Sequence, residues 1–142
     1  MTPATPPAPP EATSRRMRAV ARRDTAPELA LRRQLAGRGL RYRIDRPPLT
    51  GLRRKADVVF VRAQVAVFVD GCFWHGCPDH MTWPSSNAQW WREKVETTSR
   101  RDRDTDARLV AAGWEVIRIW EHEDPSEAAD RVEGAVRARA LR

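Results

Sequence analysis

The apolar run over residues 65–69 limits the fold of this chain more than any other segment. Its five residues, Val-Ala-Val-Phe-Val, are all apolar, so a strand there would leave neither face for water. Such a run is typical of a central strand that is buried on both faces of a sheet. A second apolar run over residues 56–61 precedes it. We therefore expect the two runs to form a hairpin.

Further helices and strands are expected on either side of this hairpin. The patterns predict strands over residues 41–44 and 115–120, and helices over residues 25–37, 87–112 and 126–140. The helix over residues 87–112 can contain one or two breaks around residues 97–99, and Gly113 is expected to end it. This mixture of elements predicts an α/β fold.

The first predicted helix has the sequence of a capping box, because Thr25 can cap it and Glu28 follows three residues later. The helix is expected to end near Gly37 or Gly39. Glu28 has two interpretations that we leave open here: the capping partner of Thr25, or a group that contacts a metal ion or its water.

At 142 residues the chain has the length of one ordinary domain, which we place at residues 14–142. Residues 1–13 contain five prolines and no basic residue, and we expect them to form a disordered tail. No apolar run is long enough to cross a membrane, and the N-terminus lacks the order of a signal peptide. We expect a cytoplasmic monomer.

The positive charge of the chain is concentrated in its first half. Residues 14–55 contain 14 arginines and lysines against three acidic residues, within a formal net charge of +7 for the whole chain. This clustering fits a polyanionic partner such as DNA, with residues 14–24 as a basic arm. The alternative is a GC-biased genome that substitutes arginine for lysine and leaves a solvated basic face.

Two cysteines and two histidines lie within nine residues after the apolar run. Cys72, Cys77 and His80 offer three of the four thiolate or imidazole ligands that a structural zinc site needs. On composition alone either His75 or His122 could be the fourth. We favour His122, because a second chelate through His75 would crowd the turn between the cysteines. The alternative is a pair of free buried cysteines with surface histidines.

Two aspartates are expected at neighbouring strands of the hairpin. Asp57 begins the first apolar strand and Asp70 follows the second, so the two carboxylates could share a divalent cation such as Mg²⁺. Asp57 is the stronger candidate, because an unpaired charge is costly to bury in an apolar strand. For each, the alternative is an aspartate that caps backbone N–H groups.

Aromatic residues follow the same loop. Phe73 and Trp74 lie between the cysteines, and Trp83, Trp90 and Trp91 come soon after. Exposed apolar side chains can enter between base steps and kink a duplex, although tryptophan belongs more often to a core. Their position in a loop favours Phe73 and Trp74 as such a wedge.

Together these motifs resemble the very short patch repair endonuclease family, over roughly residues 16–120. The segments that carry the resemblance are MRAV (17–20), RDTAPE (23–28), ADVV (56–59), FVDGCFWH (68–75), WREK (91–94), RDR (101–103) and GWEVIRIWE (113–121). The resemblance implies a restriction-endonuclease-like fold, in which helices flank a mixed central sheet. It also implies strand-specific nicking of double-stranded DNA, on the 5′ side of the thymine in a T:G mismatch left by deamination of 5-methylcytosine.

The resemblance also implies roles for individual residues. Asp57 would bind Mg²⁺ with the backbone carbonyl of Val69, and His75 would activate water. Glu28 would act through water near the metal, and Asp102 would orient the catalytic imidazole. The matching zinc ligands are Cys72, Cys77, His80 and His122, and the matching DNA contacts are Met17, Arg18, Phe73, Trp74, Trp91 and Lys94.

Three positions depart from the pattern of the family. Some members carry histidine in place of Asp70 and threonine in place of Val69, so the second metal or phosphate contact can differ here. The last zinc ligand is cysteine in the familiar pattern and His122 in this chain; imidazole is an acceptable replacement.

Two other functions fit parts of the sequence. A zinc-stabilised DNA-binding module that never cuts would need the basic arm and the zinc ligands, but not Asp57 or His75. A restriction-type or general nicking nuclease would need the same catalytic residues without a preference for mismatches. A neighbouring cytosine-5 methyltransferase gene would favour the repair function, and it could equally accompany a restriction system.

Overall fold

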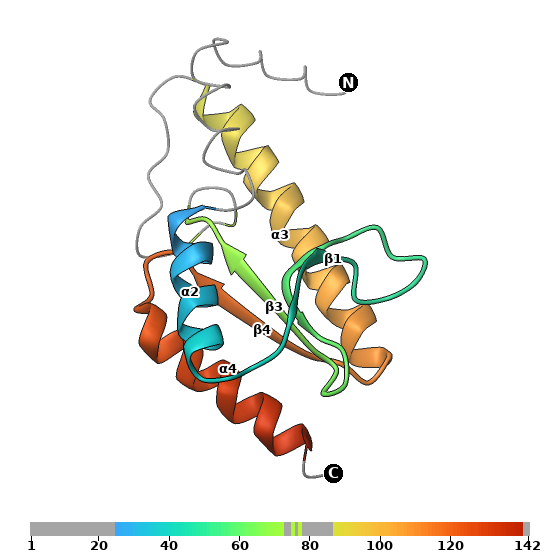
Figure 1. The fold of residues 1–142 in the computed structure, drawn as a ribbon. Helices are drawn as coiled ribbons and strands as arrows, with labels where there is room; N and C mark the ends of the chain where they lie inside the picture. Colours follow the sequence, from blue (N-terminus) through green and yellow to red (C-terminus); the bar gives the residue numbers. More distant parts are fainter. Residues whose placement is uncertain (1–24, 73–74, 76, 78–86, 141–142) are drawn as a thin grey trace.

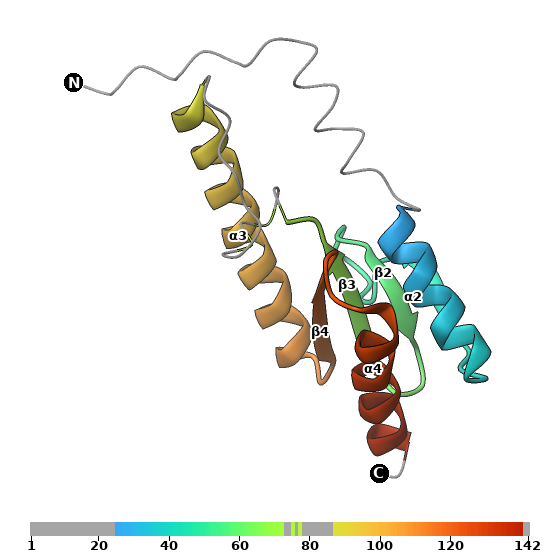
Figure 2. The same cartoon turned by 90° about the vertical axis from the view of Figure 1, so that its left-hand side faces the viewer.

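In the computed structural model, helices cover both faces of a four-stranded mixed sheet (Figures 1 and 2). The structure describes residues 25–72, 75, 77 and 87–140. The strands, in their order across the sheet, are β1 (Arg43–Arg46), β2 (Ala56–Phe60), β3 (Val65–Asp70) and β4 (Glu115–Trp120). The pairs β1–β2 and β2–β3 are antiparallel, and β3–β4 is parallel. The predicted hairpin and mixed sheet are confirmed.

Helices α2 (Ala26–Gly37) and α4 (Pro125–Ala140) cover one face of the sheet, and α3 (Ala88–Ala111) covers the other (Figure 2). Alternate strand residues point to opposite faces. Val58, Val65 and Val67 accordingly pack in the core with α2 and α4. Val59, Ala66 and Phe68 pack with Leu109 of α3 on the other side. Since β3 is buried on both faces, the apolar run behaves as predicted.

Several element boundaries differ from the sequence-based expectation. Strand β1 begins two residues later than expected, at Arg43, and runs to Arg46. It stops before Pro47, which has no N–H for a ladder. Thr25 precedes the first helix as predicted, but its side chain makes no capping hydrogen bond. The Thr25 half of the predicted capping box is therefore absent. The side chain of Glu28 is buried, with 7 % exposure, and its two interpretations stay predictions.

Helix α3 is continuous, so the expected breaks around residues 97–99 do not occur. The hydroxyl of Thr97 donates to the carbonyl of Glu93 at 2.9 Å, and that of Thr98 to Lys94 at 3.1 Å. These bonds along the helix occupy the hydroxyls that would otherwise compete with the helical backbone. Gly113, with φ +90°, follows the helix end as predicted.

No described helix combines the length and the apolar character that a membrane crossing requires.

Candidate active site

A cavity of about 320 Å³ lies where β3 ends and β2 begins. All of the predicted catalytic residues line it: Glu28, Asp57, Asp70, His75 and Asp102. The alternation of the strands explains part of this convergence. Asp57 and Asp70 follow the same alternation as Val59 and Phe68, which face α3, and Asp102 belongs to that helix. The sheet and α3 thus supply the two walls of the cavity.

Asp57 is fixed by the neighbouring strand. The backbone N–H of Val69 donates to its Oδ2 at 2.6 Å. Burial raises the pKa of the Asp57 carboxyl to about 7 against the effect of this bond, and the charges of Glu28, Asp45 and Asp70 also raise it. The backbone-capping contact therefore exists, but it does not remove the cost of burying this charge. A cation in the cavity would offset that cost.

His75 is paired with Asp102. Its Nδ1 lies 2.5 Å from Oδ2 of Asp102 and 3.7 Å from Oδ1 of Asp70. Burial lowers the pKa of the His75 imidazole, but the bond to Asp102 and the charge of Asp70 outweigh it, and the net shift is upward. A carboxylate on Nδ1 keeps the proton of the neutral imidazole on that nitrogen. Nε2 is then left as the basic atom.

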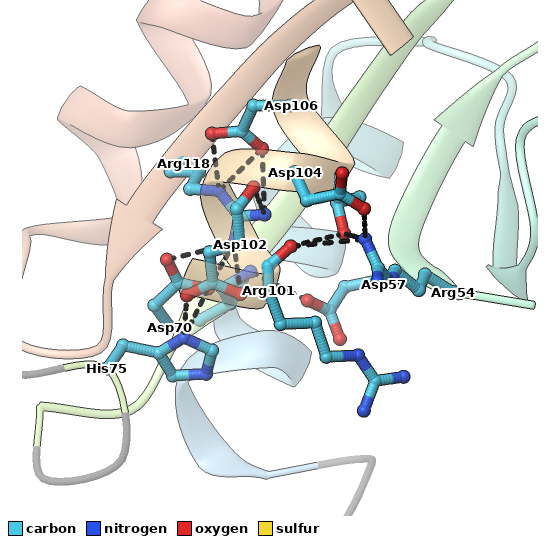
Figure 3. Close-up of polar contacts among 11 residues, drawn as sticks. Arg54, Asp57, Asp70, His75, Arg101, Asp102, Asp104, Asp106 and Arg118 are labelled. Atoms are coloured by element: carbon cyan, nitrogen blue, oxygen red, sulfur yellow. Dashed lines mark hydrogen bonds and ion pairs between the residues drawn. The ribbon is translucent and has the colours of Figure 1, made fainter. Parts of the chain in front are cut away.

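Asp70 is 5 % exposed, and Arg118 of the neighbouring strand β4 binds it. Nη1 of Arg118 lies 3.0 Å from Oδ1 and 3.2 Å from Oδ2 of Asp70 (Figure 3). Burial raises the pKa of the Asp70 carboxyl, against the charges of His75 and Arg118. Asp70 groups with His75 and Asp102 within 4.8 Å, without Asp57. The sharing of one cation by Asp57 and Asp70 therefore stays a prediction.

Basic side chains with no predicted role also line the cavity. Arg54 donates to Asp104 at 2.5 Å and to Thr105 at 2.8 Å, and so connects the start of β2 to α3. Lys55, Arg101 and Arg118 line the cavity with it. The signal that could have identified Arg118 is a charged residue among the otherwise apolar residues 116–120 of β4, where its burial demands partners.

The thiol and imidazole groups form a second cluster. Ligand atoms of Cys72, Cys77 and His122 lie within 4.8 Å of one another, and Nδ1 of His122 is 3.2 Å from the sulfur of Cys72. Both cysteines are buried and form no disulfide. Burial and Cys77 raise the pKa of the Cys72 thiol to about 12, so without a cation this thiol stays protonated. Two sulfurs and a nitrogen are donors that suit zinc. His80, the fourth predicted ligand, lies outside the described residues.

Most of the predicted DNA contacts, namely Met17, Arg18, Phe73 and Trp74, also lie outside the described residues. Trp91 is 1 % exposed and meets Trp90 edge to face at 4.7 Å. The ring is therefore not exposed in the chain without DNA, and the DNA contact of Trp91 stays a prediction. Lys94 is exposed, and its ammonium lies 5.2 Å from the ring centre of Trp90.

Comparison with known proteins gives a consistent result. The family model described as DNA mismatch endonuclease Vsr matches residues 8–80. The type II nicking enzyme V.NaeI of Lentzea aerocolonigenes is 46 % identical over 84 % of this chain and 73 % of its own length. V.NmeDIP, a type II nicking enzyme of Neisseria meningitidis serogroup C, is 36 % identical over 90 % of this chain and 88 % of its own. The DNA mismatch endonuclease Vsr of Escherichia coli K12 is 37 % identical over 76 % of this chain and 68 % of its own.

Proposed function

The chain belongs to the DNA mismatch endonuclease Vsr family and is a DNA endonuclease, and we propose that it nicks duplexes 5′ of the thymine in T:G mismatches. Such a nick would start very short patch repair after deamination of 5-methylcytosine. The observation that supports this proposal most is the convergence of Asp57 and the His75–Asp102 pair on one cavity. A functional link to a cytosine-5 methyltransferase belongs to the same proposal.

The side chains of the cavity can move the proton that hydrolysis requires. Asp102 holds the His75 proton on Nδ1, which leaves a lone pair on Nε2. Nε2 takes the proton of the attacking water, and a positioned base of this kind contributes about 10²- to 10⁴-fold to a rate. The imidazole has to be neutral to do so.

A divalent cation, which we propose to be Mg²⁺, would neutralise charge on the scissile phosphate and the leaving oxygen when bound. The carboxylate of Asp57 and the backbone carbonyl of Val69 would hold it, and Glu28 would contact it through water. Oxygen donors of this kind suit Mg²⁺. The raised pKa of Asp57 supports the assignment, because a cation relieves the repulsion among these carboxylates.

Contacts to DNA are proposed for the residues that the family resemblance indicates. Residues 14–24, with Met17 and Arg18, would reach across the minor groove, and Phe73 and Trp74 would open the duplex beside the mismatch. A wobble pair resists such a wedge less than a matched pair does. Lys94 would bind a phosphate.

Nicking is expected to increase with pH between about 6 and 8. Asp57, with a pKa of about 7, acts as a ligand only when ionised, and His75, with a raised pKa, acts as a base only when neutral. Both active forms are deprotonated, so activity is lost as the pH falls. The measurement is kcat/KM against pH at two Mg²⁺ concentrations. A higher Mg²⁺ concentration should shift only the apparent pKa that belongs to Asp57 in this profile, to lower pH. A profile that is flat from pH 5 to 8 would contradict these roles.

Zinc is expected to be bound by the Cys72, Cys77 and His122 cluster together with His80. Cys77→Ser should lose one zinc per chain by elemental analysis and lower Tm by about 10 °C or more, because a structural zinc contributes folding free energy directly. His122→Ala should also lose zinc, whereas His75→Gln should keep it. Loss of zinc from His75→Gln would show that the wrong histidine has been assigned to the cluster.

The names of the relatives favour a second candidate. Two of the three relatives named above, V.NaeI and V.NmeDIP, are type II nicking enzymes. The alternative is therefore a nuclease that nicks at a DNA sequence and does not need a mismatch. The distinguishing experiment measures Mg²⁺-dependent nicking of duplexes that differ only in one pair, T:G, T:A or C:G, in several methylation-site contexts. A preference for T:G supports mismatch repair, and equal nicking of the matched duplexes supports the alternative.

A further inference from the structure

Arg118 lies at the centre of a group of three aspartates, one buried and two half-buried, between the sheet and α3 (Figure 3). Its Nη1 contacts Asp70 at 3.0 Å and Oδ1 of Asp102 at 3.4 Å. Its Nε donates to both oxygens of Asp106, at 2.9 and 3.0 Å, and its Nη2 lies 2.8 Å from the same carboxylate. The guanidinium also lies 4.3 Å from the ring centre of Phe68. The side chain is thereby fixed from several directions.

Every nitrogen of this guanidinium already has an acceptor within the protein. Besides Asp106, Nη2 has a second acceptor in the backbone carbonyl of Asp102, at 3.4 Å. A phosphate contact would have to break one of these buried bonds, at the cost of an unpaired carboxylate. Arg118 is therefore poorly suited to bind DNA, although it lines the cavity.

Arg101 differs from Arg118 in this respect. It lines the same cavity from α3, and its backbone carbonyl accepts a hydrogen bond from Arg54 at 3.2 Å. In Figure 3 its guanidinium extends away from the aspartates, and within the described part of the chain no carboxylate pairs with it. An arginine with free donors at the edge of such a cavity suits a phosphate.

We propose that Arg118 is the positioning residue of this active site: it fixes Asp102 so that Oδ2 points at Nδ1 of His75. One oxygen of Asp102 faces Nη1 of Arg118 and the other faces His75. The same Nη1 holds Asp70, the second carboxylate near that imidazole. Asp106, which does not line the cavity, anchors Arg118 from the far side. The inference rests on the proposed role of His75 as the base.

Without Arg118, three buried or half-buried aspartates would lie close together without the guanidinium that contacts all three. Like charges at this separation repel, so Asp102 would turn away and the imidazole would lose its fixed direction. Misplacement of a catalytic group by about 1 Å costs about 10²-fold in rate. Since no donor of Arg118 is left for DNA, substrate binding should change little.

The kinetic test compares kcat and KM among matched variants on whichever duplex the wild type nicks. Arg118→Met should lower kcat about 100-fold with KM within about threefold of the wild type. Arg118→Lys should recover about tenfold of that loss, because its ammonium group supplies the positive charge without the planar set of donors of a guanidinium. Asp106→Asn, outside the cavity, should lower kcat about tenfold. Arg101→Met should instead raise KM and lower the dependence of binding on salt.

Two controls remove arginine–carboxylate ion pairs whose residues do not line the cavity. Arg137→Met removes an exposed pair with Glu133, and Asp130→Asn removes a pair with Arg38; both should nick as the wild type does. A KM effect for Arg118→Met like that of Arg101→Met would overturn the proposal, since it would show direct contact with DNA. A wild-type kcat for Asp106→Asn would overturn it too, and this variant gives a result even if Arg118→Met fails to fold.

A spectroscopic test is independent of nicking. The chain has only three histidines, so ¹⁵N shifts of the imidazoles can be assigned, with His75→Gln identifying one set. At a pH where His75 is neutral, the wild type should show the proton on Nδ1, and Asp106→Asn and Arg118→Lys a mixture of tautomers. An unchanged tautomer in both variants would overturn the positioning role. If the wild type nicks no duplex, the proposed function fails while this measurement still decides the role of Arg118.

Discussion

Replacement of Asp57 by asparagine is expected to lower the rate of nicking by about a thousandfold and to leave DNA binding nearly intact. Asparagine keeps the shape and can still accept the hydrogen bond from the N–H of Val69. It loses the negative charge that would hold the cation, and stabilisation of transition-state charge by a metal amounts to several kcal/mol. The measurement is single-turnover nicking at saturating enzyme, with binding measured separately.

The same substitution is expected to stabilise the fold at alkaline pH. The carboxyl of Asp57 has a pKa of about 7 in the folded chain and 3.8 ordinarily. Ionisation therefore costs folding free energy as the pH rises from about 4 to 7, and the cost persists above that range. Asp57→Asn, which cannot ionise, should be more stable at pH 8 by about 2 kcal/mol, less than the full shift because the site is partly open.

Mg²⁺ provides the control for this interpretation. It should raise Tm of the wild type, since a ligand that binds only the folded state stabilises it, and it should leave Tm of Asp57→Asn unchanged. An equal rise of Tm in both proteins would place the cation elsewhere. Retained nicking by Asp57→Asn would remove this residue from the mechanism.

His75→Gln is expected to lower kcat by about 10³-fold, within the range for removal of a positioned base. Glutamine can still contact Asp102 but has no basic nitrogen. Asp102→Asn should cause a similar loss, because an amide that donates to Nδ1 would favour the wrong tautomer of His75. Rates are measured on the high-pH plateau of the wild-type profile, where the proposed base is neutral.

The double variant with His75→Gln and Asp102→Asn tests whether the two residues act as one catalytic pair or independently. If Asp102 acts through His75, the double variant should be no slower than His75→Gln, because residues that act as a unit are not additive. Multiplied losses would mean that Asp102 has a role of its own. DNA binding and zinc content should be those of the wild type in all three variants.

The two cysteines proposed to bind zinc and the proposed catalytic base lie in one loop. His75 lies between Cys72 and Cys77, and His75 and Cys77 donate their N–H groups to the carbonyls of Gly71 and Cys72, at 3.1 and 2.9 Å. A metal that fixes the two cysteines would also fix the backbone that carries His75. The loss of zinc predicted for Cys77→Ser should therefore reduce nicking as well as Tm.

The parts of the fold that were predictable are those with a strong hydrophobic period. The apolar runs over residues 56–61 and 65–69 predicted the antiparallel hairpin, and the alternation over residues 115–120 predicted β4 with its observed bounds. The continuity of α3 was not predictable, because Thr97 and Thr98 weaken a helix unless their hydroxyls bond within it. That choice depends on side-chain geometry.

The candidate site was predictable as a set of acids and histidines but not as an arrangement. Motif positions brought Asp57, His75 and Asp102 into consideration, and the structure places all three at one cavity. Arg118 was missed because its partners come from β3 and α3, and only the fold brings them together. Trp91 was a predicted DNA contact through the family resemblance alone, and the sequence did not indicate that its ring is buried beside Trp90.

The most direct test of the central claim is nicking of one T:G duplex carrying a different label on each strand. The wild type with Mg²⁺ should cut only the thymine strand, at the bond 5′ of the mismatched thymine. The matched duplex should be cut at least about 100-fold more slowly, a difference of nearly 3 kcal/mol. Asp57→Asn should cut neither. Equal cutting of the matched duplex, or cuts in both strands, would contradict the claim.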